Sequence, residues 1–365
     1  MKIIIDKSLF LEKLSLASRF ISTRLASTPS LQGVLIEGKD KEVRFYSTNL
    51  ASYFYTTMKT QGGGRFRAVL EPKKIAEFLS LLDAGKVEVE VQEKTVLIVK
   101  EKTKGTFPTI SAADFPPPPQ IKEKEQEIKK DVFLENLPLV LFSASQDESR
   151  PVLTGINFIS QDEELLIVAT DGFRLSLIKA EREGKVPAML VPREFLDEVL
   201  RTIIKEDKLS MAFSKEEKLV LFKSGENTFY SRLIEGEFPP FEKVVPDSHK
   251  TRAVVDREEL LRNVRLVSVF AREVSNIVIF SFAKDGLRLS PKTEEEGQSV
   301  AFQEAQVEGE GQKVAFNFKF VLDFLNHTTA KKIVVEVLRP DSPAVFREEG
   351  NKNFLHVIMP VRIQS

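Results

Sequence analysis

Apolar residues along this chain follow two kinds of spacing. In residues 9–20 and 260–267 they recur every three or four positions, which is typical of a helix with one apolar face. Residues 43–46 and 87–91 alternate apolar and polar side chains, and residues 34–36 and 96–99 are short apolar runs, both typical of strands. The pattern predicts an α+β protein built from helices and antiparallel hairpins.

Three kinds of landmark recur at a spacing near 120 residues. One is a helix start, because residues 70–79 resemble residues 190–199. We expect Pro72 and Pro192 in the first helical turn, where the missing N–H of proline removes no hydrogen bond. A third copy spans residues 316–325, with Asn317 as the expected cap.

The other landmarks are a proline at the end of each unit and a tight turn. Pro116, Pro239 and Pro360 close the units. Asp-Gly pairs at positions 171–172 and 285–286 are typical of hairpin turns, and residues 47–52 are a degraded copy. Because the landmarks keep one order and one spacing, they predict three tandem similar domains, at residues 1–120, 121–247 and 248–365.

Prolines also predict two local irregularities. Residues 116–119 are four consecutive prolines, which favour a stiff, extended joint. Pro138 falls inside the first helix expected for the second domain, so we expect a kink there or a helix that begins near Asn136. The first strand of that domain is expected within residues 122–130.

Composition limits the possible partners. Lys and Arg number 53 and Asp and Glu 54, so the net charge is −1, whereas a tight nucleic-acid binder is usually basic. The chain lacks cysteine, a signal-peptide pattern and an apolar run of membrane length. We therefore expect a cytoplasmic protein with no membrane partner, in which any DNA contact is weak or confined to one surface.

The sequence shows no pattern of an active site. It has no phosphate-binding GxxxxGK[ST] loop, and His249, His327 and His356 are too scattered for an HExxH metal site. Asp171 and Asp285 are explained by turn chemistry. We expect no enzymatic activity, no catalytic residues, no cofactor and no metal.

Two helices in each of three units give six per chain. Suppose that these helices line a hole for duplex DNA. About eleven or twelve helices, each roughly 10 Å wide, fit around such a hole. Two chains in a closed head-to-tail ring would supply that number.

Several segments resemble one known family. The triplication, residues 169–175, the Phe-Pro unit ends and residues 357–363 are similar to the bacterial DNA polymerase III β sliding clamp. One departure is Phe173, where this family often has histidine. The resemblance implies three clamp domains with antiparallel sheets outside and helices lining a central hole, in a ring-shaped head-to-tail homodimer.

The resemblance also implies a function and its partners. The chain would be a processivity factor that encircles double-stranded DNA and tethers the DNA polymerase III α subunit, the clamp loader and other clamp-motif proteins. These partners would dock short hydrophobic peptides in a cleft formed by Leu153, Thr170, Gly172, Phe173, Arg174, Leu175, Pro239, Val244, Met359, Pro360, Val361 and Arg362. Arg174 or Arg362 is expected to orient the peptide by hydrogen bonds.

The resemblance implies two further surfaces. The DNA-facing candidates are Arg24, Lys73, Arg193 and Arg201, followed by Lys13 and Arg262. The dimer interface is expected to bring Phe107 of one chain against Val269 and Phe270 of the other.

Each expectation has a simpler alternative. The cleft residues Leu175 and Val361 could be ordinary core residues, and the basic residues could form a solvated face. The chain as a whole could be a repeat-built scaffold that binds proteins and has no role on DNA, or, less plausibly, an enzyme with an active site assembled across domains. Retention on circular DNA distinguishes a clamp from a scaffold.

Overall fold

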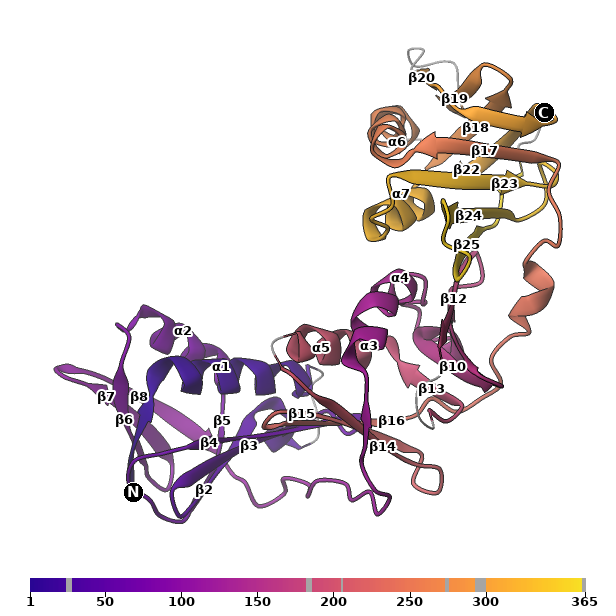
Figure 1. The fold of residues 1–365 in the computed structure, drawn as a ribbon. Helices are drawn as coiled ribbons and strands as arrows, with labels where there is room; N and C mark the ends of the chain where they lie inside the picture. Colours follow the sequence, from indigo (N-terminus) through magenta and orange to yellow (C-terminus); the bar gives the residue numbers. More distant parts are fainter. Residues whose placement is uncertain (24–27, 182–185, 205, 273–275, 293–299, 363–365) are drawn as a thin grey trace. The chain divides into compact units, whose positions relative to one another are not determined.

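The computed structural model of the chain describes residues 1–23, 28–181, 186–204, 206–272, 276–292 and 300–362 (Figure 1). The backbone forms two compact units. One unit comprises Met1–Lys130 and Glu194–Leu233, and the other comprises Asp131–Arg193 and Ile234–Ser365. No helix of the described residues is long and apolar enough to cross a membrane.

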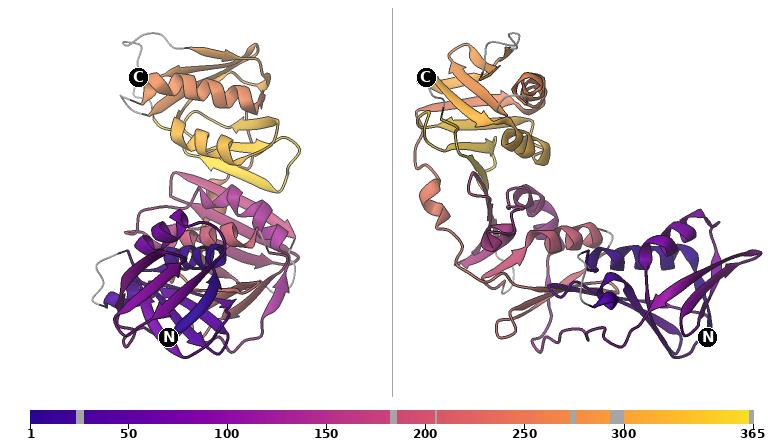
Figure 2. Two further views of the ribbon diagram at one scale, coloured as in Figure 1. Left: turned by 90° about the vertical axis from the view of Figure 1, so that its left-hand side faces the viewer. Right: turned by 180° about the vertical axis from the view of Figure 1, so that it is seen from behind.

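The first unit contains one antiparallel sheet of twelve strands. Their spatial order is β1 (Lys2–Asp6), β6 (Lys86–Val91), β7 (Thr95–Lys100), β8 (Thr103–Ile110), β5 (Phe66–Leu70), β2 (Val34–Lys39), β3 (Glu42–Thr48), β4 (Ser52–Lys59), β16 (Asn227–Arg232), β15 (Leu219–Ser224), β14 (Leu209–Ser214) and β9 (Gln126–Ile128). Helices α1 (Lys7–Ala17), α2 (Pro72–Leu81) and α5 (Arg193–Ile203) lie along one face of this sheet (Figures 1 and 2).

The second unit contains two antiparallel sheets. The larger has the order β13 (Met189–Pro192), β10 (Gly155–Gln161), β11 (Glu164–Thr170), β12 (Arg174–Glu181), β25 (Phe354–Ile358), β24 (Ala344–Glu348), β23 (Lys332–Val337), β17 (Thr251–Asp256) and β21 (Gln306–Gly309). The smaller has the order β20 (Ala301–Gln303), β19 (Gly286–Pro291), β18 (Ile277–Ala283) and β22 (Gln312–Asn317). The helices are α3 (Lys130–Asn136), α4 (Pro138–Leu141), α6 (Arg257–Ala271) and α7 (Phe318–His327).

The three sequence repeats reappear as three copies of one arrangement. Each copy begins with a strand that leads into a helix and pairs with a later strand: β1 with β6, β9 with β14, and β17 with β23. In the first and third copies an aspartate caps the helix, since Asp6 accepts from the N–H of Leu9 and Asp256 from that of Glu259, both at 2.9 Å. The predicted strand within residues 122–130 is β9.

Neighbouring repeats share a sheet. Strand β4 of the first repeat pairs with β16 of the second, and β12 of the second pairs with β25 of the third. At the first of these joins, the ring of Phe54 lies 5.2 Å from that of Phe20 and 5.1 Å from that of Phe229. Because each join buries apolar side chains, the compact units divide the middle repeat. The limits 1–120, 121–247 and 248–365 stay predictions.

The helix expected around Pro138 is interrupted. Helix α3 ends at Asn136 and α4 begins at Pro138, which has no N–H to offer to the preceding turn. Leu137, between the two helices, still donates to the carbonyl of Phe133 at 3.0 Å, so one helical hydrogen bond spans the interruption. The predicted irregularity is confirmed, but Asn136 caps nothing, because its side chain donates to the carbonyl of Val132.

Two of the three predicted helix starts are confirmed. Pro72 is the first residue of α2, and Asn317 caps α7 by accepting from the N–H of Lys319 at 3.0 Å. Pro192 is different, because it is the last residue of β13, opposite Gly155, and α5 begins one residue later.

Lys13 is buried, and this corrects its expected place on a DNA-facing surface. Its ammonium donates to Thr56 Oγ1 at 3.0 Å and to Asn227 Oδ1 at 3.3 Å, across the join of β4 and β16. Burial lowers the pKa of Lys13, and nearby glutamates only partly oppose this effect. Thr56 also donates directly to Asn227 at 2.8 Å, so both partners keep a hydrogen bond without the lysine.

We predict that Lys13→Met leaves the protein at least as stable at neutral pH, because a buried charge without a carboxylate partner contributes little to folding. The lowered pKa makes the unfolded chain bind the proton more tightly than the folded one. The free energy of unfolding of the unchanged protein should therefore rise with pH toward 10.5, the ordinary lysine value, whereas the variant lacks this rise. Urea titrations of both proteins between neutral pH and pH 10.5 measure the difference, and parallel curves would contradict it.

Candidate functional site

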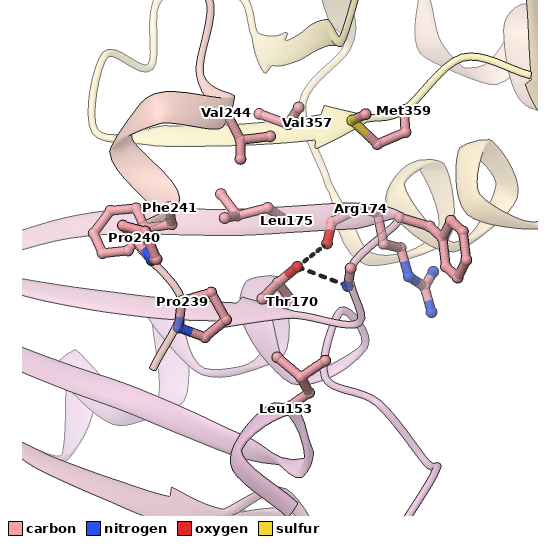
Figure 3. Close-up of a pocket in the computed structure, with 12 residues that line it drawn as sticks. Leu153, Thr170, Arg174, Leu175, Pro239, Pro240, Phe241, Val244, Val357 and Met359 are labelled. Atoms are coloured by element: carbon pink, nitrogen blue, oxygen red, sulfur yellow. Dashed lines mark hydrogen bonds between the residues drawn. The ribbon is translucent and has the colours of Figure 1, made fainter. Parts of the chain in front are cut away.

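A pocket of about 240 Å³ opens in the second unit, beside the pairing of β12 with β25 (Figure 3). It is lined by Leu153, Thr170, Gly172, Phe173, Arg174, Leu175, Pro239, Pro240, Phe241, Val244, Val357 and Met359. Nine of the twelve residues predicted for the cleft are among them. Residues that lie far apart in the sequence thus surround one cavity.

The turn between β11 and β12 forms one side of the pocket. Thr170 donates to the carbonyl of Arg174 at 2.6 Å and accepts from the N–H of Gly172 at 3.0 Å (Figure 3). Asp171 accepts from the N–H groups of Phe173 and Arg174. Gly172 has φ +91°, which side chains rarely allow, so glycine is needed here for backbone geometry.

The floor of the pocket is part of the hydrophobic core. Leu175 and Val357 are opposite each other in the β12–β25 pairing, and both pack in a cluster with Phe241 and Leu355. Leu175 is therefore a core residue and a lining residue at once. A floor held by two paired strands is rigid, which reduces the entropy that binding a ligand costs.

The mouth of the pocket is apolar and open to solvent. Phe173 is 60% exposed, and Val244 and Met359 are about one third exposed. Pro239 and Pro240 line the opposite side and offer no N–H. Exposed apolar side chains around a concave apolar surface are typical of a binding site.

Three predicted residues lie outside the pocket lining. Pro360, Val361 and Arg362 follow β25, and the N–H of Val361 donates to the carbonyl of Ala315 in β22 at 2.8 Å. This bond directs the end of the chain along the third repeat. The lining also includes Pro240, Phe241 and Val357, which were not predicted. Val357 reaches the pocket because it pairs with Leu175, a contact that the sequence does not show.

The guanidinium of Arg174 is already held by carboxylates beside the pocket, and its expected role in orienting a peptide stays a prediction. Its guanidinium bonds Asp171 at 3.0 Å and Asp323 of α7 at 2.5 Å, and it is only 11% exposed. It also lies over the rings of Phe142 and Phe320, at 5.7 and 4.7 Å. Arg174 therefore fastens the pocket turn to α7, a task that needs the planar, multiply donating guanidinium.

Behind Arg174 lies a buried polar chain. Ser143 and Ser176 are 2.7 Å apart, and Ser176 is 2.8 Å from Nδ1 of His356. Burial lowers the pKa of His356 well below its ordinary value, and the positive charge of Arg174 adds to this effect. His356 is thus a neutral structural residue. Among the residues that the structure describes, no group of side chains could hold a metal ion.

Comparison with known proteins decides the family. Models of the DNA polymerase III beta subunit match the chain in three consecutive segments: the N-terminal domain at residues 1–119, the central domain at 127–240 and the C-terminal domain at 242–362. The chain belongs to the DNA polymerase III beta-subunit family. The members are non-enzymatic sliding clamps. The three domain models and the structural match confirm the α+β architecture of three clamp domains.

Individual relatives agree over the full length. The beta sliding clamp of Bacillus subtilis (strain 168) is 28% identical over 378 residues, covering 99% of this chain and 100% of that protein. The beta sliding clamp of Synechocystis sp. is 27% identical, with complete coverage of both. The crystal structure of the Thermotoga maritima DNA polymerase III beta subunit has 26% identity and a TM-score of 0.93, covering all of both chains.

The residues predicted to face DNA differ in their surroundings. Lys73 on α2 and Arg262 on α6 are exposed. Arg201 is exposed too, but it pairs with Asp197 at 2.7 Å and with Glu198 at 3.9 Å. Arg193 is half-buried at the start of α5, and Arg24 lies outside the described residues. The positive charge available to a phosphate backbone is therefore small.

The residues predicted for the dimer interface also differ in their exposure to solvent. Phe107 on β8 is half-buried, because its ring lies 5.4 Å from that of Phe78. Val269 and Phe270, at the end of α6, are 54% and 42% exposed. Leu266 and Phe302 of the same unit are also exposed. The third repeat thus has apolar side chains that its own core does not cover.

We predict that Arg174 and Asp323 stabilise the protein jointly. In a double-mutant cycle of Arg174→Met and Asp323→Asn, the coupling energy should be about 1 kcal/mol, a value limited by the partial exposure of Asp323. Urea unfolding of the two single variants and the double variant measures it. If the two substitutions change the free energy of unfolding additively, Arg174 and Asp323 do not stabilise the protein jointly.

Proposed function

We propose that two copies of this chain form a head-to-tail ring around double-stranded DNA, and that the pocket beside β12 and β25 docks their partners. Sliding clamps are the family to which the chain belongs, and the observation that carries the proposal is the match of all three family models across residues 1–362. Because the ring would act on replicating DNA, we place it in the cytoplasm.

The pocket suits a short, extended, hydrophobic peptide. Its floor is apolar and rigid, whereas Met359 at its mouth is flexible enough to accept several different side chains. The proposed partners are the DNA polymerase III α subunit, the clamp loader and other proteins that carry a clamp motif. Phe173, in the position where the family often has histidine, makes the mouth more apolar and removes a group that would titrate.

The dimer would cover the exposed apolar end of α6. Val269 and Phe270 project there, and large exposed apolar groups favour association. In a head-to-tail ring they would meet Phe107 and the neighbouring part of β8 in the other chain. Such an interface joins unlike surfaces and closes only if the rotation between subunits completes a circle.

Contact with DNA would be weak. The net charge is −1, and the candidates Lys73, Arg193 and Arg201 are few, partly buried or already paired. A clamp benefits from this weakness, because firm phosphate contacts would slow sliding. Retention then depends on a closed ring and not on affinity.

Membership of the sliding-clamp family argues against the alternative function, a protein-binding scaffold without a role on DNA. The test is synthesis by the polymerase on a primed, circular single strand in the presence of a clamp loader and ATP. The proposal requires that added protein lengthens the products made in one binding event. Unchanged product length, with peptide binding intact, would favour the scaffold.

We predict that pocket variants lose partner peptides. Two variants test this: a deletion of residues 359–365, and a double change of Val244 and Met359 to glutamate. Each should lower the affinity for a fluorescent peptide from the polymerase α subunit by more than about tenfold, because apolar burial is lost. Fluorescence anisotropy measures affinity, and sedimentation should show that the dimer persists. Unaltered affinity in a folded dimer would remove this pocket from the proposal.

We predict that Phe270→Asp produces monomers, because a desolvated charge would replace an apolar contact. Phe173→Asp is the matched control, since Phe173 is equally apolar and more exposed but lies at the pocket mouth. Sedimentation velocity should give the 41.3 kDa chain for the first variant and twice that mass for the control. A dimer of Phe270→Asp would exclude this residue from the interface.

A further inference from the structure

A second cavity, of about 290 Å³, lies in the first unit beside the pairing of β4 with β16. Its walls include the turn between β3 and β4, Tyr53, Tyr230 and the four prolines at residues 116–119. This join connects the first and second repeats, as the β12–β25 join connects the second and third. The cavity is therefore in the equivalent place of the repeated architecture.

The turn beside this cavity repeats the turn of the first pocket bond for bond. Thr48 donates to the carbonyl of Ser52 at 2.7 Å and accepts from the N–H of Leu50 at 2.9 Å. Asn49 accepts from the N–H groups of Ala51 and Ser52. Leu50 has φ +72°, in the position where the first pocket has Gly172. A non-glycine residue keeps this conformation only where its surroundings hold it.

The strands and the ends of the repeats also correspond. Tyr53 is opposite Tyr230 as Leu175 is opposite Val357. Two residues beyond these pairs, the N–H of Arg232 donates to the carbonyl of Ala51 at 2.8 Å, as Met359 donates to Phe173 at 2.9 Å. The prolines that begin at Pro116 stand where Pro239 and Pro240 stand in the first pocket. The backbone frame of the two cavities is thus the same.

The side chains give the second cavity a different character. Arg232 takes the place of Met359 and is the only charged residue among the described residues that line the cavity. It is exposed, its side chain donates only to the carbonyl of Leu50 at 3.3 Å, and it takes part in none of the ion pairs among the described residues. The hydroxyl of Tyr53 donates to the carbonyl of Pro116 at 3.2 Å, which holds the proline wall against the sheet.

We propose that this cavity is a second peptide-docking site, which takes an extended segment of a partner protein with apolar residues on the tyrosine–proline wall and a carboxylate at Arg232. The inference rests on the proposed function in one respect, the peptide-binding role of the first pocket. An arginine without a carboxylate partner at the edge of an apolar cavity favours an acidic group. Tyrosine and proline walls accept extended apolar chains.

A single-stranded nucleic acid fits the cavity less well. The ring of Tyr53 is only 5% exposed and is packed against Tyr46 and Phe115, so it offers no free face for a base. Arg232 is also a single cation, whereas binding along a phosphate backbone draws on several.

The test is to pan a phage library of random heptapeptides against the full-length protein in which Val244 and Met359 are both glutamate, so that the first pocket is closed. We expect enrichment of peptides with apolar residues next to Asp or Glu. Synthetic copies should bind about tenfold more weakly when the same protein also carries Arg232→Ala, which removes the partner of the peptide carboxylate. Ala51→Arg should have a similar effect, because its larger side chain fills the cavity. Arg65→Ala, which changes an exposed arginine outside the lining, should leave affinity unchanged.

Several results would overturn the proposal: no enrichment above the background of the library, enriched peptides without acidic residues, equal affinity for the Arg232→Ala variant, or (dT)20 that competes with the peptides. Panning the same library against the protein with an open first pocket tests the other site separately. Peptides selected there should be lost when Val244 and Met359 are changed. Failure of that selection would weaken the proposed function and leave the result for the second cavity standing.

Discussion

Strand pairing across the joins connects each repeat to the next. At each join a strand of one repeat pairs with a strand of the next, β4 with β16 and β12 with β25. An unpaired edge strand would expose a row of N–H and C=O groups and favour uncontrolled association. Pairing satisfies them and brings a hairpin turn, a proline wall and the end of the next repeat together. Both cavities are consequences of these joins.

Identical frames at the two joins carry different side chains. The pocket at the join of the second and third repeats is lined mainly by apolar residues without tyrosine, and Arg174 links its turn to α7. The join of the first and second repeats contains all four tyrosines of the chain within its sheet, with a buried lysine on the opposite, helix-covered side. The two joins thus share the backbone geometry of their turns and strand pairs, whereas their lining side chains differ. The strands supply rigidity, and the exposed residues at each mouth supply selectivity.

Local signals in the sequence predicted local structure well. The Asp171–Gly172 turn, the interruption at Pro138 and the cap at Asn317 each follow from the chemistry of one or two neighbouring residues. Nine pocket residues were predicted by resemblance to a family whose repeats this chain keeps. What sequence could not show are contacts between distant residues. Asp323 lies 149 positions from Arg174, and Asn227 lies 214 from Lys13. Those pairings decide whether a basic side chain is free or committed, and no local pattern records them.

We infer that this protein is retained on DNA by the topology of a closed ring and not by its affinity for DNA. The most direct test of this inference loads the labelled protein onto nicked circular plasmid with a clamp loader and ATP, removes free protein by gel filtration, and then cuts half of the sample once with a restriction enzyme. We expect the label to stay with the circle at physiological salt and to leave the linear molecule within the time of a second filtration. Equal retention on both forms, or equal loss from both, would contradict it.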